Sequence, residues 1–465
     1  MTDVDVLVLG AGSGGYATAL RAAQLGLRVT LVERDRLGGT CLHQGCIPTK
    51  ALLHAAEVAD HVRDAAHVGV RASLEGIDMP AVNAYRDQVV SRLFKGLTGL
   101  VGSRGITVVA GEGRVTGPRE VTVTDAAGVA TVHTGRHLVL ATGSMPRTLP
   151  AVPIDGRRVV TSEEALRLDR VPASVVVLGG GVIGCEFASI WRSLGAEVTL
   201  VEALPRLVAG EDEAASAALQ RGFRKRGITV RTGSPVTGVK VEEGTAGPVT
   251  VALEGGDTLR ADLLLVAVGR VARVDDLGFE AIGVRVERGL VVTDERCRTG
   301  VDGVYAVGDL TAGPQLAHRG FAQGMFVAED IAGLSPAPVD PAAVPRVTYS
   351  RPEVASVGLT ETEAVQAHGA DAVRSLTYDL AGNGKAQILG TQGFVKLVRR
   401  VDGPLLGVHL VGDRVGDLVG EAQLMVGWEA HPEDVAPLVH AHPTLDEALG
   451  EACLALAGSP LHTHG

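Results

Sequence analysis

Runs of consecutive apolar residues, each followed by a glycine-rich turn or an acid, mark the first part of the chain. Asp5–Leu9 is such a run; an alanine-rich helical stretch to about Leu25 and a second run, Arg28–Glu33, follow it. An uninterrupted apolar run of this length is typical of a strand buried on both faces of a parallel sheet. The pattern therefore predicts a strand–helix–strand unit at the start of the chain.

The same pattern returns in the middle of the chain. Val175–Leu178 leads into a second glycine-rich turn, and the next predicted strand ends at Glu202. Gly179 follows Gly10 by 169 residues, and each of these glycines precedes a strand-end acid, Glu33 or Glu202, by 23 residues. This equal spacing indicates two units of the same architecture in one chain.

Other elements are predicted from shorter patterns. Helices are expected at 49–66 and 80–103, alternating strands at 106–110, 120–124 and 131–134, and further strands at 137–144, 262–270 and 301–309. Pro146, Pro150 and Pro153 indicate a linker after the first unit. From about Ala342 the pattern changes to antiparallel-like strands (346–349, 393–399, 406–411) and helices (417–429, 445–456), which predicts a third, α+β domain.

Each of the two glycine-rich turns carries the motif G-x-G-x-x-G between a strand and a helix. The motif glycines are Gly10, Gly12 and Gly15 in the first unit and Gly179, Gly181 and Gly184 in the second. Such a turn lets a pyrophosphate approach the backbone at the helix N-terminus, and the strand-end acid accepts hydrogen bonds from ribose hydroxyls. The sequence therefore predicts two dinucleotide sites. Glu202 favours NAD in the second, because a carboxylate would repel the 2′-phosphate of NADP.

Two cysteines five residues apart lie in the stretch 38–50. On an undistorted helix Cys41 and Cys46 would point about 140° apart, too divergent for a disulfide, but Gly45 and Pro48 are residue types that loosen such a turn. We interpret the pair as a disulfide that opens and closes during turnover, with Lys50 stabilising a thiolate. A metal site is the weaker alternative, because no second cysteine pair or Cys/His cluster completes four ligands.

The C-terminal stretch His440–Glu447 permits two interpretations that do not exclude each other. Thr444 and Glu447 fit a capping box ahead of an apolar helix. Alternatively His442 is a general base whose second nitrogen is oriented by Glu447. Asp309, at the end of a predicted strand, is open to a similar choice between a cofactor hydroxyl and a helix cap.

Composition narrows the class of protein. The 465 residues carry a net charge of −11, which makes nucleic acid an unfavourable partner, and no apolar run approaches the length of a membrane span. Met1–Asp5 lacks the basic region of a signal peptide, so we expect a cytoplasmic protein. Three further cysteines (185, 297, 453) are expected to be packed thiols. His462 and His464 lie in a tail that we expect to be solvated, and no metal site is predicted.

These motifs together resemble one known family. The chain resembles the pyridine nucleotide–disulfide oxidoreductases over essentially its whole length, and their lipoamide branch more than their glutathione branch. The matching motifs are GAGSGGY (10–16), GGTCLHQGCIPTK (38–50), ATGS (141–144), GGGVIGCEFA (179–188), VYAVGD (304–309), QLAH (315–318), RPEVASVG (351–358) and HAHPTLDE (440–447).

The resemblance implies a role for each site residue. Cys41 would be the thiol that meets substrate and Cys46 the thiol beside the flavin, with Lys50 paired to Glu186, while His442 and Glu447 would reach the disulfide from a partner subunit. The residues implied to contact FAD are Gly10, Gly12, Ser13, Gly14, Gly15, Glu33, Arg34, Gly39, Thr40, Lys50, Gly113, Thr142, Gly143, Asp309 and Ala317. The residues implied to contact NAD are Gly179, Gly181, Val182, Ile183, Gly184, Glu202, Val236 and Gly269.

The resemblance also implies an architecture and an activity. The expected fold is α/β, with an FAD-binding domain (1–147, completed by 272–341), an NAD-binding domain (148–271) and a C-terminal α+β dimerisation domain (342–465). The expected activity is the oxidation of protein-bound dihydrolipoamide by NAD⁺ through the disulfide and FAD. The expected partners are a second copy of the chain and the lipoyl domains of 2-oxoacid dehydrogenase or glycine cleavage complexes.

Two departures and two alternatives accompany this interpretation. Val271-Ala272-Arg273 replaces the usual x-Pro-Asn, and 320–324 (GFAQG) lacks the acids common after QLAH. A reductase of another small disulfide, such as glutathione or mycothiol disulfide, is the nearest alternative activity. From a different class, an FAD-binding scaffold or redox sensor would use the same cofactor sites without turnover.

Overall fold

The computed structural model describes residues 4–242 and 247–462. The chain forms two compact units. Unit 1 comprises the residues up to Ala51, Pro80–Arg147 and Arg270–Pro341; unit 2 comprises Leu52–Met79, Thr148–Gly269 and the residues from Ala342 onward.

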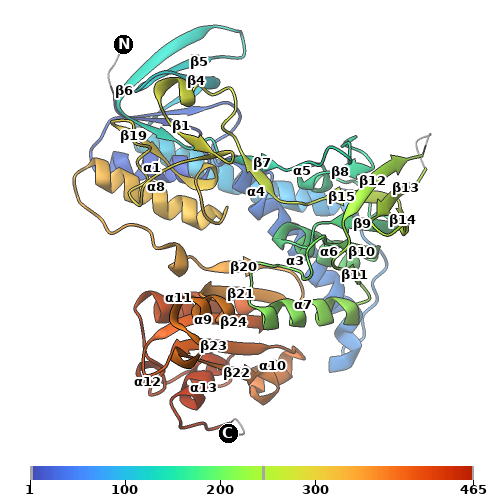
Figure 1. Cartoon of the computed structure of the whole chain (residues 1–465). Helices are drawn as coiled ribbons and strands as arrows, with labels where there is room; N and C mark the ends of the chain where they lie inside the picture. Colours follow the sequence, from blue (N-terminus) through green and yellow to red (C-terminus); the bar gives the residue numbers. More distant parts are fainter. Residues whose placement is uncertain (1–3, 243–246, 463–465) are drawn as a thin grey trace. The chain divides into compact units, whose positions relative to one another are not determined.

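Unit 1 is built on a parallel sheet with an antiparallel ribbon continuing from it. The sheet has the order β3-β2-β1-β6-β19, and the ribbon pairs β6 with β5 and β5 with β4 (Figure 1). The strands are β1 (Val4–Leu9), β2 (Val29–Glu33), β3 (Thr107–Ala110), β4 (Glu112–Gly117), β5 (Glu120–Thr124), β6 (Ala130–Leu140) and β19 (Val304–Ala306). β1 lies in the middle and is fully buried from Val6 to Val8, as its uninterrupted apolar run predicts.

Two helices of unit 1 pack closely through small residues. They are α1 (Ser13–Gln24) and α8 (Ala317–Ile331), which lie side by side (Figure 1). A Cβ on Gly324 would lie 2.4 Å from the carbonyl oxygen of Gly14, so only glycine admits this contact. The other elements that begin or lie in unit 1 are α2 (Gly39–His43), α3 (Cys46–Asp64), α4 (Met79–Ser103), β7 (Ser144–Pro146), β16 (Arg270–Ala272), β17 (Val286–Glu287) and β18 (Leu290–Val291).

Unit 2 repeats the strand–helix–strand design. Its parallel sheet has the order β11-β10-β9-β15-β8, and a separate antiparallel sheet has the order β12-β13-β14. These elements are β8 (Val159–Val160), α5 (Ser162–Ala165), β9 (Ser174–Leu178), α6 (Val182–Leu194), β10 (Glu197–Val201), α7 (Glu213–Lys225), β11 (Thr229–Arg231), β12 (Val236–Val241), β13 (Val249–Leu253), β14 (Thr258–Ala261) and β15 (Leu263–Val266).

The C-terminal part of unit 2 is an antiparallel sheet with helices packed on it. The strand order is β20-β21-β24-β23-β22, and α11 and α13 share one apolar core with this sheet. The elements are β20 (Arg346–Thr348), β21 (Glu353–Gly358), α9 (Glu361–His368), β22 (Val373–Asp379), α10 (Gly384–Leu389), β23 (Phe394–Arg400), β24 (Leu405–Gly412), α11 (Val415–Gly427), α12 (Pro432–Val435) and α13 (Glu447–Leu456). The predicted fold class is confirmed: two Rossmann-type arrangements and a C-terminal α+β part.

The structure adds elements that the sequence patterns did not predict. β4, β21 and β22 are among the additional strands, and the segments predicted at 131–134 and 137–144 join in the single strand β6, which ends at Leu140. β7 ends at Pro146, at the start of the predicted linker, and pairs with β16. None of the helices within the described ranges has the combination of length and apolar character needed to span a bilayer.

Candidate active site

The two glycine-rich turns have the same geometry. Gly10 and Gly179 adopt φ of +100° and +111°, a conformation that favours glycine. In each motif the helix that follows packs closely against this first glycine. A Cβ on Gly15 would lie 1.8 Å from the carbonyl oxygen of Gly10, and a Cβ on Gly184 would lie 1.8 Å from that of Gly179. The third glycine of each motif is therefore required for packing the helix against the turn.

The middle glycine of each motif has open space around it. Gly12 and Gly181 are the N-caps of α1 and α6, no side chain caps either helix, and an ideal Cβ at either position would meet no protein atom within 4 Å. An uncapped helix N-terminus with exposed amides is a binding site for a pyrophosphate. The residues present thus fit a dinucleotide in both units.

The strand-end acids lie where the sequence predicts them. Glu33 accepts hydrogen bonds from the amides of Ala11 (2.7 Å) and Asp35 (2.9 Å). Glu202 accepts equivalent bonds from the amides of Gly180 (2.6 Å) and Leu204 (2.7 Å). Both carboxylates are thus held against the glycine-rich turn, and their remaining acceptor capacity suits ribose hydroxyls.

The cysteine segment lies against the first glycine-rich turn. The amide of Gly38 donates to the carbonyl of Ala11 (2.9 Å), and a Cβ on Gly39 would lie 2.7 Å from the Cα of Gly12. Cys41 belongs to α2, whereas Cys46 begins α3, so Gln44 and Gly45 break the helix between the two cysteines. This break confirms the predicted loosening at Gly45; Pro48 is accommodated in the first turn of α3, where a missing amide proton costs nothing.

The two thiols contact each other in the structure. Their side chains share a hydrogen bond, and no S–S bond joins any cysteines within residues 4–242 and 247–462. The hydrogen bond with Cys46 and burial raise the pKa of Cys41, while the charge of Lys50 lowers it. Cys46 lies at the N-terminus of a 19-residue helix, where the helix dipole stabilises a thiolate.

Tyr16 is a neighbour of this pair that sequence reasoning did not assign to the site. Burial raises its pKa to about 12, with further contributions from the nearby Cys41 and Cys46. Its ring packs against Phe321, with the ring centroids 5.4 Å apart. Tyr16 ends the GAGSGGY motif, which is the signal that locates it.

A polar network in unit 1 holds the segments around Asp309. Ser144 Oγ donates to Asp309 (2.6 Å) and accepts from Arg270 Nε (2.7 Å), and Thr142 Oγ1 donates to the carbonyl of Arg273 (2.7 Å). Val271 and Ala272, where the departure from the family pattern begins, belong to the strand β16 (Arg270–Ala272), which pairs with β7. Sequence reasoning named Asp309 and Thr142 but not Ser144 and Arg270.

Other predicted FAD residues lie in varied settings. Gly113 is buried in β4, where a Cβ would meet Leu9 at 2.5 Å; Gly14 packs against Gly320 and Val307; Ala317 is the first residue of α8; Arg34 is exposed. Gly143, the third residue of the ATGS motif, has open space around it. Packing explains Gly113 and Gly14 without a cofactor, so their FAD contacts stay predictions.

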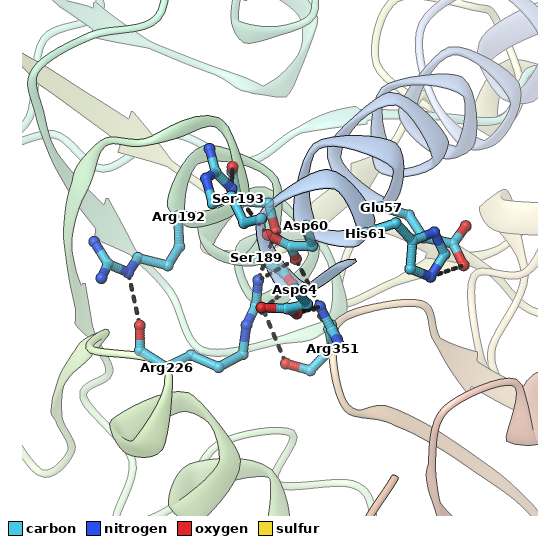
Figure 2. Close-up of polar contacts among 10 residues, drawn as sticks. Glu57, Asp60, His61, Asp64, Ser189, Arg192, Ser193, Arg226 and Arg351 are labelled. Carbon is cyan, nitrogen blue, oxygen red and sulfur yellow. Dashed lines mark hydrogen bonds and ion pairs between the residues drawn. The ribbon is translucent and has the colours of Figure 1, made fainter. Parts of the chain in front are cut away.

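The far end of the helix that starts at Cys46 is anchored in unit 2. Asp60 of α3 is 8% exposed and accepts hydrogen bonds from Ser193 Oγ (2.7 Å), Arg226 (3.1 Å) and Arg351 (3.1 Å) (Figure 2). Arg226 also donates to Ser189 Oγ at 2.7 Å. One buried carboxylate therefore joins α3 to α6, to the residue after α7 and to the segment before β21.

His442 and Glu447 form a pair in unit 2. His442 Nδ1 lies 2.8 Å from Glu447 Oε1, which leaves Nε2 as the basic nitrogen of an exposed ring. Glu447 Oε2 also accepts from the amide of Thr444 (2.8 Å), whereas the Thr444 hydroxyl donates to the carbonyl of Ala441. Only the glutamate half of the predicted capping box forms. Although burial raises the pKa of Glu447, the bonds from Thr444 and His442 lower it on balance.

The remaining predicted residues of unit 2 are placed as follows. Glu186 is buried on α6 and accepts from the amide of Tyr349 (3.1 Å), so its pairing with Lys50 stays a prediction. Val182 and Ile183 open α6, Val236 opens β12, and Gly269 follows β15. The side chain of His462 is 64% exposed, as expected for a solvated tail, and its Nδ1 lies 2.6 Å from Glu451 Oε1. His464 lies outside the described residues.

The three other cysteines are buried, which confirms that they are packed, and burial raises the pKa of each thiol. Within the described residues, no group of three or more His, Cys, Asp or Glu side chains is arranged to hold a metal ion.

The structure has two glycine-rich turns of the same geometry, each suited to a dinucleotide, and a thiol pair beside the first. These features define a flavin- and nicotinamide-dependent disulfide oxidoreductase. The chain belongs to the pyridine nucleotide–disulphide oxidoreductase family, whose model matches residues 4–324; a model of that family's dimerisation domain matches residues 344–453. Members bind FAD and NAD, so both cofactor predictions are confirmed, and the dimerisation domain supports the predicted homodimer.

Individual relatives cover the whole chain. A dihydrolipoyl dehydrogenase of Bacillus subtilis is 40% identical over 99% of both chains, and one of Chlorobaculum tepidum is 42% identical over 96% of both. The crystal structure of LpdA from Mycobacterium tuberculosis matches with a TM-score of 0.91 at 28% identity, covering 97% of this chain and 100% of that one.

Proposed function

We propose that this chain is a dihydrolipoyl dehydrogenase, which oxidises dihydrolipoamide to lipoamide with NAD⁺ through a Cys41–Cys46 disulfide and FAD. The observation that carries the proposal is the thiol pair itself. Cys41 and Cys46 contact each other across a helix break, beside a glycine-rich turn suited to a dinucleotide. Full-length relatives of 40% and 42% identity with that activity support the choice of substrate.

In the proposed reaction the protein acts mainly through thiol–disulfide exchange. His442 of one subunit accepts a proton from a substrate thiol at Nε2, and Glu447 stabilises the imidazolium that forms. The substrate thiolate attacks the sulfur of Cys41, the Cys41–Cys46 bond breaks, and Cys46 leaves as a thiolate. His442 then passes its proton to Cys41 and takes the proton of the second substrate thiol, whose sulfur displaces Cys41 and releases lipoamide. The dipole of α3 stabilises the thiolate of Cys46. The charge of Lys50, which lowers the pKa of Cys41, also favours a thiolate at this pair.

FAD would supply the two-electron acceptor between the dithiol and NAD⁺. Gly10, Gly12, Gly15 and Glu33 would hold FAD, and Gly179, Gly181, Gly184 and Glu202 would hold NAD. The remaining residues named above for each cofactor are part of the same proposal. We add Tyr16, which lies beside the thiols, to the residues proposed for the FAD site.

The domain limits, partners and location complete the proposal. We place an FAD-binding domain at 1–147, completed by 272–341, an NAD-binding domain at 148–271 and the dimerisation domain at 342–465. Protein-bound dihydrolipoamide implies lipoyl domains of 2-oxoacid dehydrogenase or glycine cleavage complexes as partners. A reducing cytoplasm suits a chain whose three further cysteines are buried thiols.

Steady-state kinetics test this function. Purified protein should be yellow from bound flavin and should reduce NAD⁺ with dihydrolipoamide. His442→Gln should lower that rate by about 10²-fold or more, the scale of general base catalysis. A parent protein that turns over glutathione or mycothiol disulfide, but not dihydrolipoamide, would contradict the proposed substrate. An unchanged rate in His442→Gln would remove this residue from the mechanism.

A further inference from the structure

The loop that carries His442 also carries a second histidine in the opposite environment. The side chain of His442 is 78% exposed, whereas that of His440, two residues earlier, is 14% exposed. His440 Nε2 lies 2.9 Å from Glu421 Oε1 on α11. Two histidine–glutamate pairs therefore lie two residues apart in the chain, one half-buried and one presented to solvent.

The ring of His440 occupies a space that only a glycine leaves free. An ideal Cβ on Gly450 of α13 would lie 2.6 Å from His440 Nδ1 and 2.8 Å from Cε1. A glycine inside a helix costs about 1 kcal/mol relative to alanine. Gly450 is fully within α13, so its position is explained by the ring that packs on it.

This contact lies close to the residue that orients His442. Gly450 follows Glu447 by three residues on α13, so both lie on the same face of the helix. Beyond His442 the loop is held by Asn383 Nδ2, which donates to the carbonyl of Thr444 (3.0 Å), and by the buried side chain of Leu445. His442 is thus the exposed part of a loop fixed on both sides.

We propose that His440, bonded to Glu421 and packed on Gly450, is a positioning residue for His442. The Glu421–His440 pair ties the loop to α11, and the ring contact ties it to α13 within one turn of Glu447. The inference rests on the function proposed above, because it takes His442 as the base that meets the substrate thiol.

The single substitutions that test this role disturb the His440 ring without replacing His440 or His442. In Gly450→Ala the new Cβ pushes the ring away; in the control Gly420→Ala, on α11, it meets no atom within 4 Å. Glu421→Ala removes the partner of His440, and Glu421→Gln keeps an acceptor. For each variant the ratio of dihydrolipoamide–NAD⁺ turnover to NADH oxidation by an artificial acceptor is measured on dimers isolated by size exclusion. Because both rates come from the same folded dimers, loss of folded protein does not alter the ratio.

The expected ratio falls by about tenfold or more in Gly450→Ala and Glu421→Ala, since a 1 Å misplacement of a catalytic group can cost about 10²-fold. Gly420→Ala and Glu421→Gln keep the parent ratio within about twofold. In the double variant His440→Ala/Gly450→Ala the clash is gone, yet the ratio stays low because the loop is no longer held. A parent-like ratio in both Gly450→Ala and Glu421→Ala, or its return in the double variant, overturns the inference.

The parent enzyme and His442→Gln distinguish this failure from failure of the proposed function. If the parent oxidises dihydrolipoamide and His442→Gln does not, the function stands, and parent-like ratios in both Gly450→Ala and Glu421→Ala refute only the role of His440.

Discussion

Replacing Gly181 by alanine tests whether the second glycine-rich turn binds the pyrophosphate of NAD. Gly181 has φ of −76° and ψ of −174°, which alanine adopts without strain, and its ideal Cβ meets no protein atom within 4 Å. Folding should therefore be unaffected. The new methyl group would instead occupy the space above the uncapped N-terminus of α6, where the pyrophosphate approaches the backbone amides.

The expected loss of NADH affinity follows from the backbone-to-phosphate hydrogen bonds that the methyl group would disrupt. Losing one charge-assisted hydrogen bond between a backbone amide and a phosphate costs about 1.5–3 kcal/mol. This corresponds to a rise of about 10- to 150-fold in the Kd for NADH. In contrast, Gly184→Ala would place a Cβ 1.8 Å from the carbonyl oxygen of Gly179, so this change should also lower the thermal unfolding midpoint.

The assay is calorimetric titration of the FAD-loaded protein with NADH, accompanied by thermal unfolding. Gly12→Ala is the matched control, because its ideal Cβ is equally open but lies in the first turn. It should weaken flavin retention and leave the Kd for NADH unchanged. A Gly181→Ala variant that folds normally and binds NADH with the parent Kd would refute the reasoning, since the cofactor would not then pass over Gly181.

Three further predictions address the thiols, pH and stability. Cys41→Ser should abolish dihydrolipoamide turnover while NADH oxidation by artificial acceptors continues, because only the sulfur attacked by substrate is lost; survival of both activities would remove the disulfide from the path. Burial raises the pKa of Glu353 from 4.5 to about 7, so the folded state holds this proton more tightly and stability falls as pH rises through that range. In Glu353→Gln, the fall of the unfolding free energy with rising pH over this range should be smaller by about 3 kcal/mol, as measured by urea titration at each pH. The control Glu213→Gln, at an exposed position, should keep the pH dependence of the parent. Asp60→Ala should lower the free energy of unfolding by about 3 kcal/mol, because Arg226 loses its buried counter-charge, and an unchanged urea midpoint would contradict this.

Much of the fold follows from local patterns. β1 and β9 are continuous apolar runs, and the acids that end the next strands lie at the predicted positions, because a strand–turn–helix unit places all of these through short-range geometry. β22 was missed because it is an edge strand with several polar, exposed residues, which leaves little hydrophobic signal. In β21 (EVASVG) the two valines are separated by alanine and serine and followed by glycine, which leaves a weak strand signal.

The candidate site was predictable where one motif contains all its parts. The contact between Cys41 and Cys46 and the pair His442–Glu447 each lie within six residues of sequence, so one local motif contains both partners. For the cysteines, Gly45 and Pro48 supply the signal for the helix break that lets the thiols meet. Ser144 and Arg270 are 126 residues apart and meet only through the pairing of β7 with β16. No local pattern encodes that meeting, nor the contact of the Gly450 backbone with the His440 ring.

The way Glu33 and Glu202 are held has a consequence for nucleotide binding. Each carboxylate accepts one amide from its glycine-rich turn and one from the residue two positions after it, so hydrogen bonds within the protein hold the turn against the strand end. Little conformational entropy is then lost on association, and affinity depends mainly on contacts with the nucleotide. Stripped protein should therefore take up flavin quickly, as a preorganised receptor does, without a slow folding phase.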